Sequence, residues 1–180
     1  MTETQYISSS RLKFFIRLIL ILVILAAVVF TVYEVVQDRS NVSVGEKAPD
    51  FELKTMDGQI VKLSDLKGQG VLLNFWGTWC DPCKEEMPAI NKAHKQNIKG
   101  VKILAINIQE SPSIVKKFYE SYHLDFTTVL DKTGKVKHKY HVSNIPSTFL
   151  IDKNGVVVKK VVGAMNSADD VVKNLKLVQP

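Results

Sequence analysis

The chain has 180 residues, a net charge of +6 and a hydrophobic content of 46%, which allow one ordinary domain plus an appendage. Four basic against three acidic side chains leave +1 on residues 1–40 and therefore +5 on the remainder, where the lysines form no run interleaved with aromatic residues. A solvated basic surface is the simpler interpretation, and no nucleic-acid partner is expected.

An apolar segment dominates the N-terminal part of the chain. From Phe14 to Tyr33 the only charged residue is Arg17, and a stretch of about 20 such residues spans a bilayer. Arg11 and Lys13 add positive charge to its N-terminal flank, which keeps that flank cytoplasmic. We therefore expect a single-pass protein of the cell membrane, with its N-terminus cytoplasmic and its folded part extracytoplasmic.

This interpretation divides the chain into four parts. They are a cytoplasmic N-terminus at residues 1–13, a transmembrane anchor at 14–36, a linker at 37–46 and a folded domain at 47–180. A cleaved signal peptide is the competing interpretation. Ala26 and Ala27 are small, but apolar residues continue after them and no A-x-A pattern closes the segment, which favours an uncleaved anchor.

A β-hairpin and a central strand are predicted at the start of the folded domain. Asp57-Gly58 is a turn signal between the strand-like segments 51–53 and 60–63. Residues 64–66 suit a short helical turn. The run at residues 71–76 is almost continuously apolar, which is typical of a strand buried on both faces.

The remaining segments alternate between helix and strand patterns. The predicted elements are a helix at 82–97 with a kink at Pro88, a strand at 101–107, a helix capped by Ser113 and continuing to 122, a strand at 126–130, helical turns at 135–140, a hairpin of 148–151 with 156–162, and a helix at 167–178. Strands alternating with helices predict a three-layer α/β domain with a mixed sheet.

Cys80 and Cys83 are the only cysteines in the chain, and two residues separate them. That spacing is typical of a redox-active dithiol. The first cysteine stands at a predicted strand-to-helix junction, where the helix N-terminus stabilises a thiolate. Because a thiolate is the species that attacks disulfides, the pair predicts thiol–disulfide exchange.

The sequence gives less support to two other roles for the cysteine pair, a structural disulfide and a zinc site. A structural disulfide of this spacing closes a very short loop and removes little chain entropy. A zinc site normally needs four ligands, whereas the chain has no second cysteine pair and its four histidines lack a matching spacing. We therefore expect no metal and no cofactor.

Several long motifs in a fixed order resemble a known family. They are APDF at 48–51, LSDLKG at 63–68, LNFWGTWCDPCK at 73–84 and IPSTFLI at 145–151. The chain resembles the thioredoxin superfamily and, within it, the membrane-anchored ResA/TlpA-like thiol–disulfide oxidoreductases, the ResA branch above all. The resemblance implies a thioredoxin-like α/β/α domain with a central mixed sheet, an N-terminal β-hairpin extension and one preceding transmembrane helix.

The resemblance also implies a role for each residue that matches these motifs. Cys80 would be the attacking thiol and Cys83 the buried resolving thiol of one redox disulfide. Glu86 matches an active-site carboxylate, and Pro146 matches the cis-proline beside the dithiol. Substrate contacts are expected from Trp79, Asp81, Pro82, Ile145 and Pro146.

Two acidic residues carry a further hypothesis. Negative charge on Asp81 and Glu86 would oppose thiolate formation at Cys80, which predicts a less acidic nucleophile than in strongly oxidising relatives. Glu86 would also exchange a proton during the reaction. The alternative for Glu86 is that it only favours the N-terminal half of the helix, as Glu85 does, and Asp81 departs from the residue that some relatives have.

The function implied is an extracytoplasmic reductase that keeps apocytochrome c cysteines reduced for haem attachment. Its partners would be apocytochrome c, or another disulfide-bearing client, and a membrane thiol–disulfide carrier as electron donor. A ResA-like paralogue acting in spore-cortex formation and a disulfide-forming oxidase stay open as alternatives. A peroxidase is disfavoured because Gly77 stands where peroxiredoxins need a threonine, and a metal-binding module would be distinguished by its metal content.

Overall fold

The structure is a computed structural model that describes residues 9–38 and 42–180. It forms two compact units, residues 1–41 and 42–180. In the first unit, helix α1 (Ser9–Asp38) contains an apolar stretch, Leu12–Val32, that is long and apolar enough to cross a membrane. At about 1.5 Å per residue, this stretch is about 30 Å long, the thickness of a bilayer core. A signal sequence has the same features.

The second unit begins at Val42 rather than at the expected residue 47. Val42 is buried in the domain core. The N–H of Gly45 donates to Val157 O at 2.8 Å, and the N–H of Val157 donates to Glu46 O at 2.9 Å. Residues 42–46 were expected in the linker because the segment 37–46 is largely polar and irregular, but the backbone of Gly45 and Glu46 pairs with the start of a strand. Residues 39–41 of that linker lie outside the described residues.

A seven-stranded mixed sheet forms the centre of the second unit, in the order β2-β1-β5-β4-β3-β6-β7. The strands are β1 (Glu52–Thr55), β2 (Ile60–Lys62), β3 (Gly70–Trp76), β4 (Val101–Ile108), β5 (Thr127–Asp131), β6 (Ser147–Ile151) and β7 (Val157–Val162). The β3–β4 and β4–β5 pairs are parallel, whereas the other pairs are antiparallel. The predicted hairpins and the buried central strand are confirmed.

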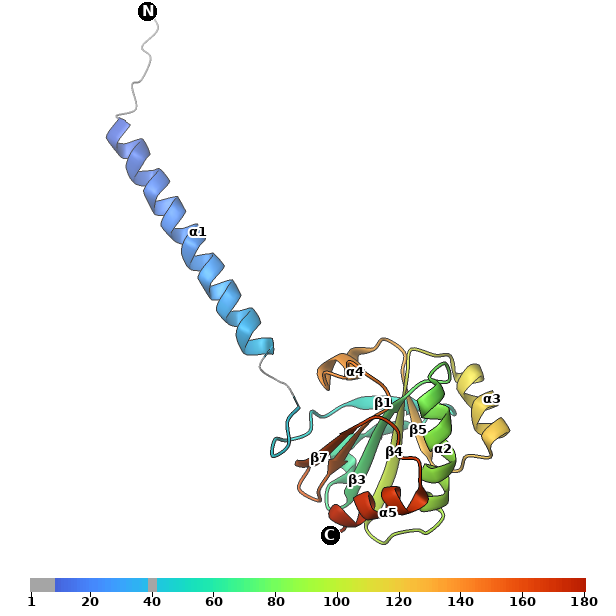
Figure 1. The fold of residues 1–180 in the computed structure, drawn as a ribbon. Coiled ribbons are helices and arrows are strands. Elements are labelled where there is room, and N and C mark those ends of the chain that lie inside the picture. The colour runs from blue at the N-terminus through green and yellow to red at the C-terminus, as the bar shows by residue number, and fades with distance from the viewer. Residues whose placement is uncertain (1–8, 39–41) are drawn as a thin grey trace, which may run out of the picture. The chain divides into compact units, whose positions relative to one another are not determined.

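Helices cover both faces of this sheet (Figure 1). They are α2 (Asp81–His94), α3 (Pro112–Tyr122), α4 (Lys135–Lys139) and α5 (Ala168–Leu177), with a short 3-10 helix, η1 (Leu63–Leu66). Leu72 and Trp76 of β3 pack with α2, α3 and α5, while Leu73 and Phe75 pack with α4, η1 and the N-terminal segment. Because β3 is buried on both faces, its sequence is apolar throughout except for one residue, Asn74.

Two helix boundaries differ from the prediction. Ser111, not Ser113, caps α3, since its side chain accepts from the N–H of Ile114 and Pro112 occupies the first turn. A proline suits that position because it lacks the N–H that the first turn leaves unpaired. Helix α2 ends at His94, three residues before the expected Asn97, which has a φ of +48°. The helix continues through Pro88.

The topology gathers four loops at one edge of the sheet. Strands β3, β4 and β5 are parallel, so their carboxyl ends lie at the same edge. Strand β6 runs antiparallel to β3 and its first residue, Ser147, pairs with Phe75. The loops after β3, β4 and β5 and the loop before β6 therefore meet there, as ligand-binding loops commonly do in α/β sheets.

Candidate active site

The two cysteines lie at the start of α2. Cys80 follows the loop after β3 and caps the helix, and the N–H of Cys83 donates to Cys80 Sγ at 3.2 Å. The cysteines form a disulfide with an S–S distance of 2.09 Å. Cys80 keeps 6% of its surface exposed and Cys83 keeps none, so Cys80 is the one that an incoming sulfur can reach. The helix N-terminus would stabilise its thiolate in the reduced protein.

The loop before β6 lies directly against Cys80. The Ile145–Pro146 peptide bond is cis, and Ile145 O lies 3.7 Å from Cys80 Sγ. Within residues 42–180, the N–H of Ile145 makes no hydrogen bond, whereas Pro146 O accepts from the N–H of Gly163 at 2.9 Å. A free N–H beside the sulfur is a place where an extended polypeptide can pair with the backbone.

Glu86 is fully buried one helical turn beyond Cys83. Its Oε1 accepts from Asn74 Nδ2 at 2.8 Å, and its Oε2 accepts from the N–H of Met165 at 3.1 Å. Burial raises the pKa of Glu86 to about 7, against the lowering effect of these two hydrogen bonds. A carboxyl group with this pKa exchanges its proton readily near neutral pH.

Asn74 is a residue that the sequence analysis did not single out. It lies in the middle of β3 and is fully buried. Its Nδ2 donates to Glu86 and also to Thr148 Oγ1 at 3.0 Å, which links the helix with the dithiol to strand β6. The signal was present in the sequence, because Asn74 is the one polar residue inside an apolar run and a buried amide needs partners.

Asp81 is exposed and forms an ion pair with Lys84, whereas Glu86 is buried. Lys84 Nζ lies 2.7 Å from Asp81 Oδ1, and this hydrogen bond from Lys84 lowers the pKa of Asp81. The positive charge of Lys84 offsets the negative charge of Asp81. The two expected acidic residues therefore act under different conditions, one in water beside a lysine and one in the core.

The two tryptophans near the dithiol have different surroundings. Trp76 is fully buried, packs against Phe118 and donates through Nε1 to Thr128 Oγ1 at 3.3 Å. Trp79 is 61% exposed. A Cβ on Gly77 would lie only 2.7 Å from the indole nitrogen of Trp79, so a larger residue at position 77 would displace the Trp79 side chain. Pro82 is exposed in the first turn of α2.

A second contact that the sequence analysis missed holds the loop before Cys80. Thr78 donates to the carboxylate of Glu110 through its N–H, at 2.8 Å, and through its hydroxyl. Asn107 Nδ2 donates to the same carboxylate at 2.7 Å. No local pattern could have identified this contact, because 32 residues separate Thr78 from Glu110.

In the described part of the chain, no group of three or more His, Cys, Asp and Glu side chains is placed to hold a metal ion. The groups brought together at this edge of the sheet are instead the disulfide, a free backbone N–H and a carboxyl group with a pKa near neutrality. This set suits the exchange of electrons and protons between sulfur atoms.

Known proteins are similar to this chain in both sequence and fold. A protein-family model described as the AhpC/TSA family matches residues 44–160. Thiol-disulfide oxidoreductase ResA of Bacillus subtilis (strain 168) is 44% identical over 158 residues, 87% of this chain and 88% of the relative. ResA of Geobacillus kaustophilus (strain HTA426) is 43% identical over 166 residues, 91% of this chain and 95% of the relative.

A solved structure of a thiol–disulfide interchange protein is similar to this chain in fold. A Chlorobium tepidum protein described as a putative thiol:disulfide interchange protein DsbE has a TM-score of 0.68 and 36% identity, covering 76% of this chain and 96% of that chain. The domain is therefore thioredoxin-like, as expected from its motifs. The chain belongs to the ResA group of thioredoxin-like thiol–disulfide oxidoreductases, within the AhpC/TSA family.

Proposed function

We propose that the protein reduces disulfides of extracytoplasmic client proteins and thereby keeps the haem-binding cysteines of apocytochrome c reduced. The observation that carries the proposal is the environment of the dithiol. A buried carboxyl group with a pKa of about 7 lies one turn behind Cys83, and a free backbone N–H lies beside Cys80. Similarity to ResA over most of the chain supports the choice of client.

The reaction transfers two electrons from the dithiol to a client disulfide. In the reduced protein the Cys80 thiolate attacks one client sulfur, forms a mixed disulfide and releases the other client sulfur as a thiolate. Cys83 then attacks Cys80 Sγ, which restores the Cys80–Cys83 disulfide and releases the second client sulfur. The Cys83 thiol must lose a proton for this step, and the Glu86 carboxylate accepts it.

The client would bind along the loop before β6. Its backbone pairs with the free N–H of Ile145, which places the target sulfur next to Cys80. Trp79, Pro82 and Pro146 would contact the client here, and the Asp81–Lys84 pair would form a charged margin. A membrane thiol–disulfide carrier then reduces the protein again, because each turnover leaves Cys80 and Cys83 oxidised.

The anchor fixes where this reaction takes place. The positive residues at the N-terminal flank of the apolar stretch hold the N-terminus in the cytoplasm, and α1 spans the membrane without being cleaved. The catalytic domain then faces the extracytoplasmic space. Protease added to cells stripped of their wall should remove the domain if this orientation is correct, and it should leave the domain intact if the orientation is reversed.

The test of the function uses an oxidised peptide with a C-x-x-C-H sequence and the reduced full-length chain in detergent. We expect the wild-type chain to reduce the peptide. The Cys80→Ser variant should be inactive, and the Cys83→Ser variant should accumulate the mixed disulfide, which a mass measurement detects. A wild-type chain that leaves the peptide oxidised, or instead oxidises a reduced peptide, contradicts the proposal.

A deletion strain distinguishes the client from the alternative in spore-cortex formation. Loss of haem-stained cytochromes c, restored by wild-type protein and not by the Cys80→Ser variant, supports the cytochrome client. Normal cytochromes c with a defective cortex would support the alternative.

A further inference from the structure

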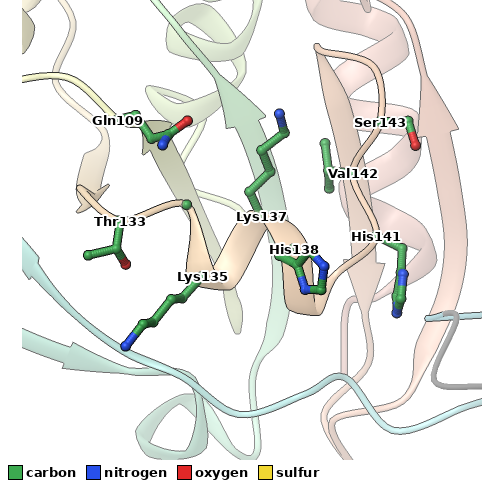
Figure 2. Close-up of a pocket in the computed structure, with 9 residues that line it drawn as sticks. Gln109, Thr133, Lys135, Lys137, His138, His141, Val142 and Ser143 are labelled. Atoms are coloured by element: carbon green, nitrogen blue, oxygen red, sulfur yellow. The ribbon is translucent and has the colours of Figure 1, made fainter. Parts of the chain in front are cut away.

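A basic pocket lies at the same edge of the sheet as the dithiol. It has a volume of about 630 Å³. We call it the basic pocket and define it by six lining residues, Gln109, Lys135, Lys137, His138, His141 and Ser143. Figure 2 shows where these side chains arise, on α4, on the segment that follows it and on the segment after β4, with Lys135 and Lys137 extending in opposite directions from α4.

The positive charge of this region comes from one short stretch of sequence. Residues 132–143 contain four lysines, two histidines and no acidic residue. Asp131, just before them, is buried, and its Oδ2 accepts from the N–H of Lys137 at 2.7 Å. The carboxylate therefore helps to begin α4, and its negative charge partly offsets the positive charge of the stretch.

The side chains of the two pocket lysines, Lys135 and Lys137, make no ion pair with the described residues. Lys139 differs, because its Nζ donates to Asp50 O at 2.8 Å. Lys135 is exposed and Lys137 is half-buried. Ammonium, imidazole, amide and hydroxyl groups together are donors that suit a carboxylate.

Two short segments join the pocket to the dithiol. Ser143 stands two residues before Ile145, whose carbonyl oxygen lies 3.7 Å from Cys80 Sγ. Gln109 lines the pocket, and its neighbour Glu110 accepts the hydrogen bonds of Thr78 in the loop before Cys80. A polypeptide that paired with Ile145 would advance by about 3.3 Å per residue, so residues a few positions from its disulfide would lie near Ser143 at the margin of the pocket.

We propose that the basic pocket binds acidic side chains of the client polypeptide that flank its disulfide, an inference that rests on the proposed function. The pocket then selects clients by charge, while the dithiol performs the chemistry. A client polypeptide fits better than a membrane surface, because the pocket is hollow and continues into the segment that pairs with the client backbone.

The test compares two oxidised peptides that differ only in having Glu or Gln on both sides of the same Cys-x-x-Cys disulfide. The full-length chain is used in nanodiscs of zwitterionic lipid, and each rate is divided by the rate with dithiothreitol, which corrects for the intrinsic reactivity of the peptide. We expect the Glu peptide to react roughly two- to tenfold faster at low salt, an advantage that shrinks as salt screens the charges.

Matched variants identify the pocket as the source of this preference. Lys135→Gln with Lys137→Gln should remove the advantage of the Glu peptide. Lys116→Gln with Lys117→Gln removes the same charge from exposed positions on α3, on the other face of the sheet, and should keep it. An equal loss in both double variants would show a general effect of net charge and would overturn the proposal.

A binding measurement separates this inference from the proposed function. The Cys80→Ser, Cys83→Ser chain has no redox chemistry, and fluorescence anisotropy gives its affinity for both peptides. If neither peptide is reduced but the Glu peptide binds more tightly, the proposed function fails and the pocket assignment holds. Equal binding and equal corrected rates overturn the pocket assignment, and so does lysine-dependent binding to phosphatidylglycerol vesicles without any preference between the peptides.

Discussion

The dithiol and the basic pocket share one edge of the sheet, but their ionisable groups differ in solvent exposure. Glu86 is fully buried among Asn74, Met165 and the dithiol helix, and its pKa rises to about 7. The lysines of the pocket are exposed or half-buried, with no ion pair in the described residues. Burial tunes a group for proton transfer, whereas exposure leaves a charge free to attract a partner.

Replacing Glu86 should change the pH dependence of stability more than any other substitution considered below. Its folded pKa is raised from 4.5 to about 7, so the folded protein holds this proton more tightly than the unfolded chain does. The contribution of neutral Glu86 is fully present below about pH 4.5 and is lost as the pH rises through 7, on the order of 3 kcal/mol in total. In Glu86→Gln this loss should disappear.

Urea unfolding of both chains at pH 4.5 and pH 8 measures that difference. Tryptophan fluorescence follows the catalytic domain, because both tryptophans belong to it. The contributions of the other titrating groups to the free energy of unfolding cancel when the two chains are compared at the same pH. If the difference between the two chains is the same at both pH values, Glu86 does not have the raised pKa.

Removal of Asn74 should have the next largest effect. In Asn74→Ala the carboxyl group of Glu86 loses a buried hydrogen bond, which lowers stability by about 2 kcal/mol and moves the pKa of Glu86 further upward. The pH midpoint of the exchange rate should therefore rise. Thr148→Val is the matched control, since it removes the other acceptor of Asn74 Nδ2 and leaves the bond to Glu86; an equal shift in the control would show that Asn74 does not set this pKa.

The catalytic role of Glu86 predicts a pH-dependent rate. In the wild-type chain the step in which Cys83 attacks Cys80 should accelerate as the pH rises through about 7, since only the carboxylate accepts a proton. Glu86→Gln should slow that step by roughly tenfold or more and remove its inflection near pH 7. Rapid-mixing measurements of decay of the mixed disulfide test this, and an unchanged inflection would assign it to another group.

The smallest effect is expected at Asp81. Its carboxylate is exposed and paired with Lys84, and exposed pairs contribute little and are screened by salt. Asp81→Asn should change the exchange rate by less than about twofold at moderate salt. A large change in the same assay would mean that Asp81 acts on the thiolate despite Lys84.

Local patterns in the sequence were sufficient to predict much of the fold and the position of the dithiol. The run at 71–76, the two hairpins and the position of Cys80 before a helix follow from apolar periodicity and turn residues, which act over a few positions. The burial of Glu86 could not be predicted this way, because it depends on strands β3 and β6 and on Met165, which is 79 residues away. Only the resemblance to a family indicated that this glutamate differs from Glu85.

The missed features share a physical cause, which is pairing between distant segments. Residues 42–46 end a largely polar segment and gave no strand pattern, yet Gly45 and Glu46 pair with Val157 at the start of β7. Thr78 binds Glu110 across 32 residues. The basic stretch at 132–143 was visible in the sequence as scattered lysines, but only the sheet topology places it beside the loop that contacts Cys80.

The reduction potential of the Cys80–Cys83 pair decides whether the protein reduces client disulfides or forms them. It is measured by equilibrating the full-length chain with mixtures of reduced and oxidised glutathione or dithiothreitol. We expect a value near or below about −220 mV, in the range of glutaredoxins and thioredoxins, at which the dithiol reduces its clients. A value near about −120 mV, typical of a strong disulfide donor, would contradict it.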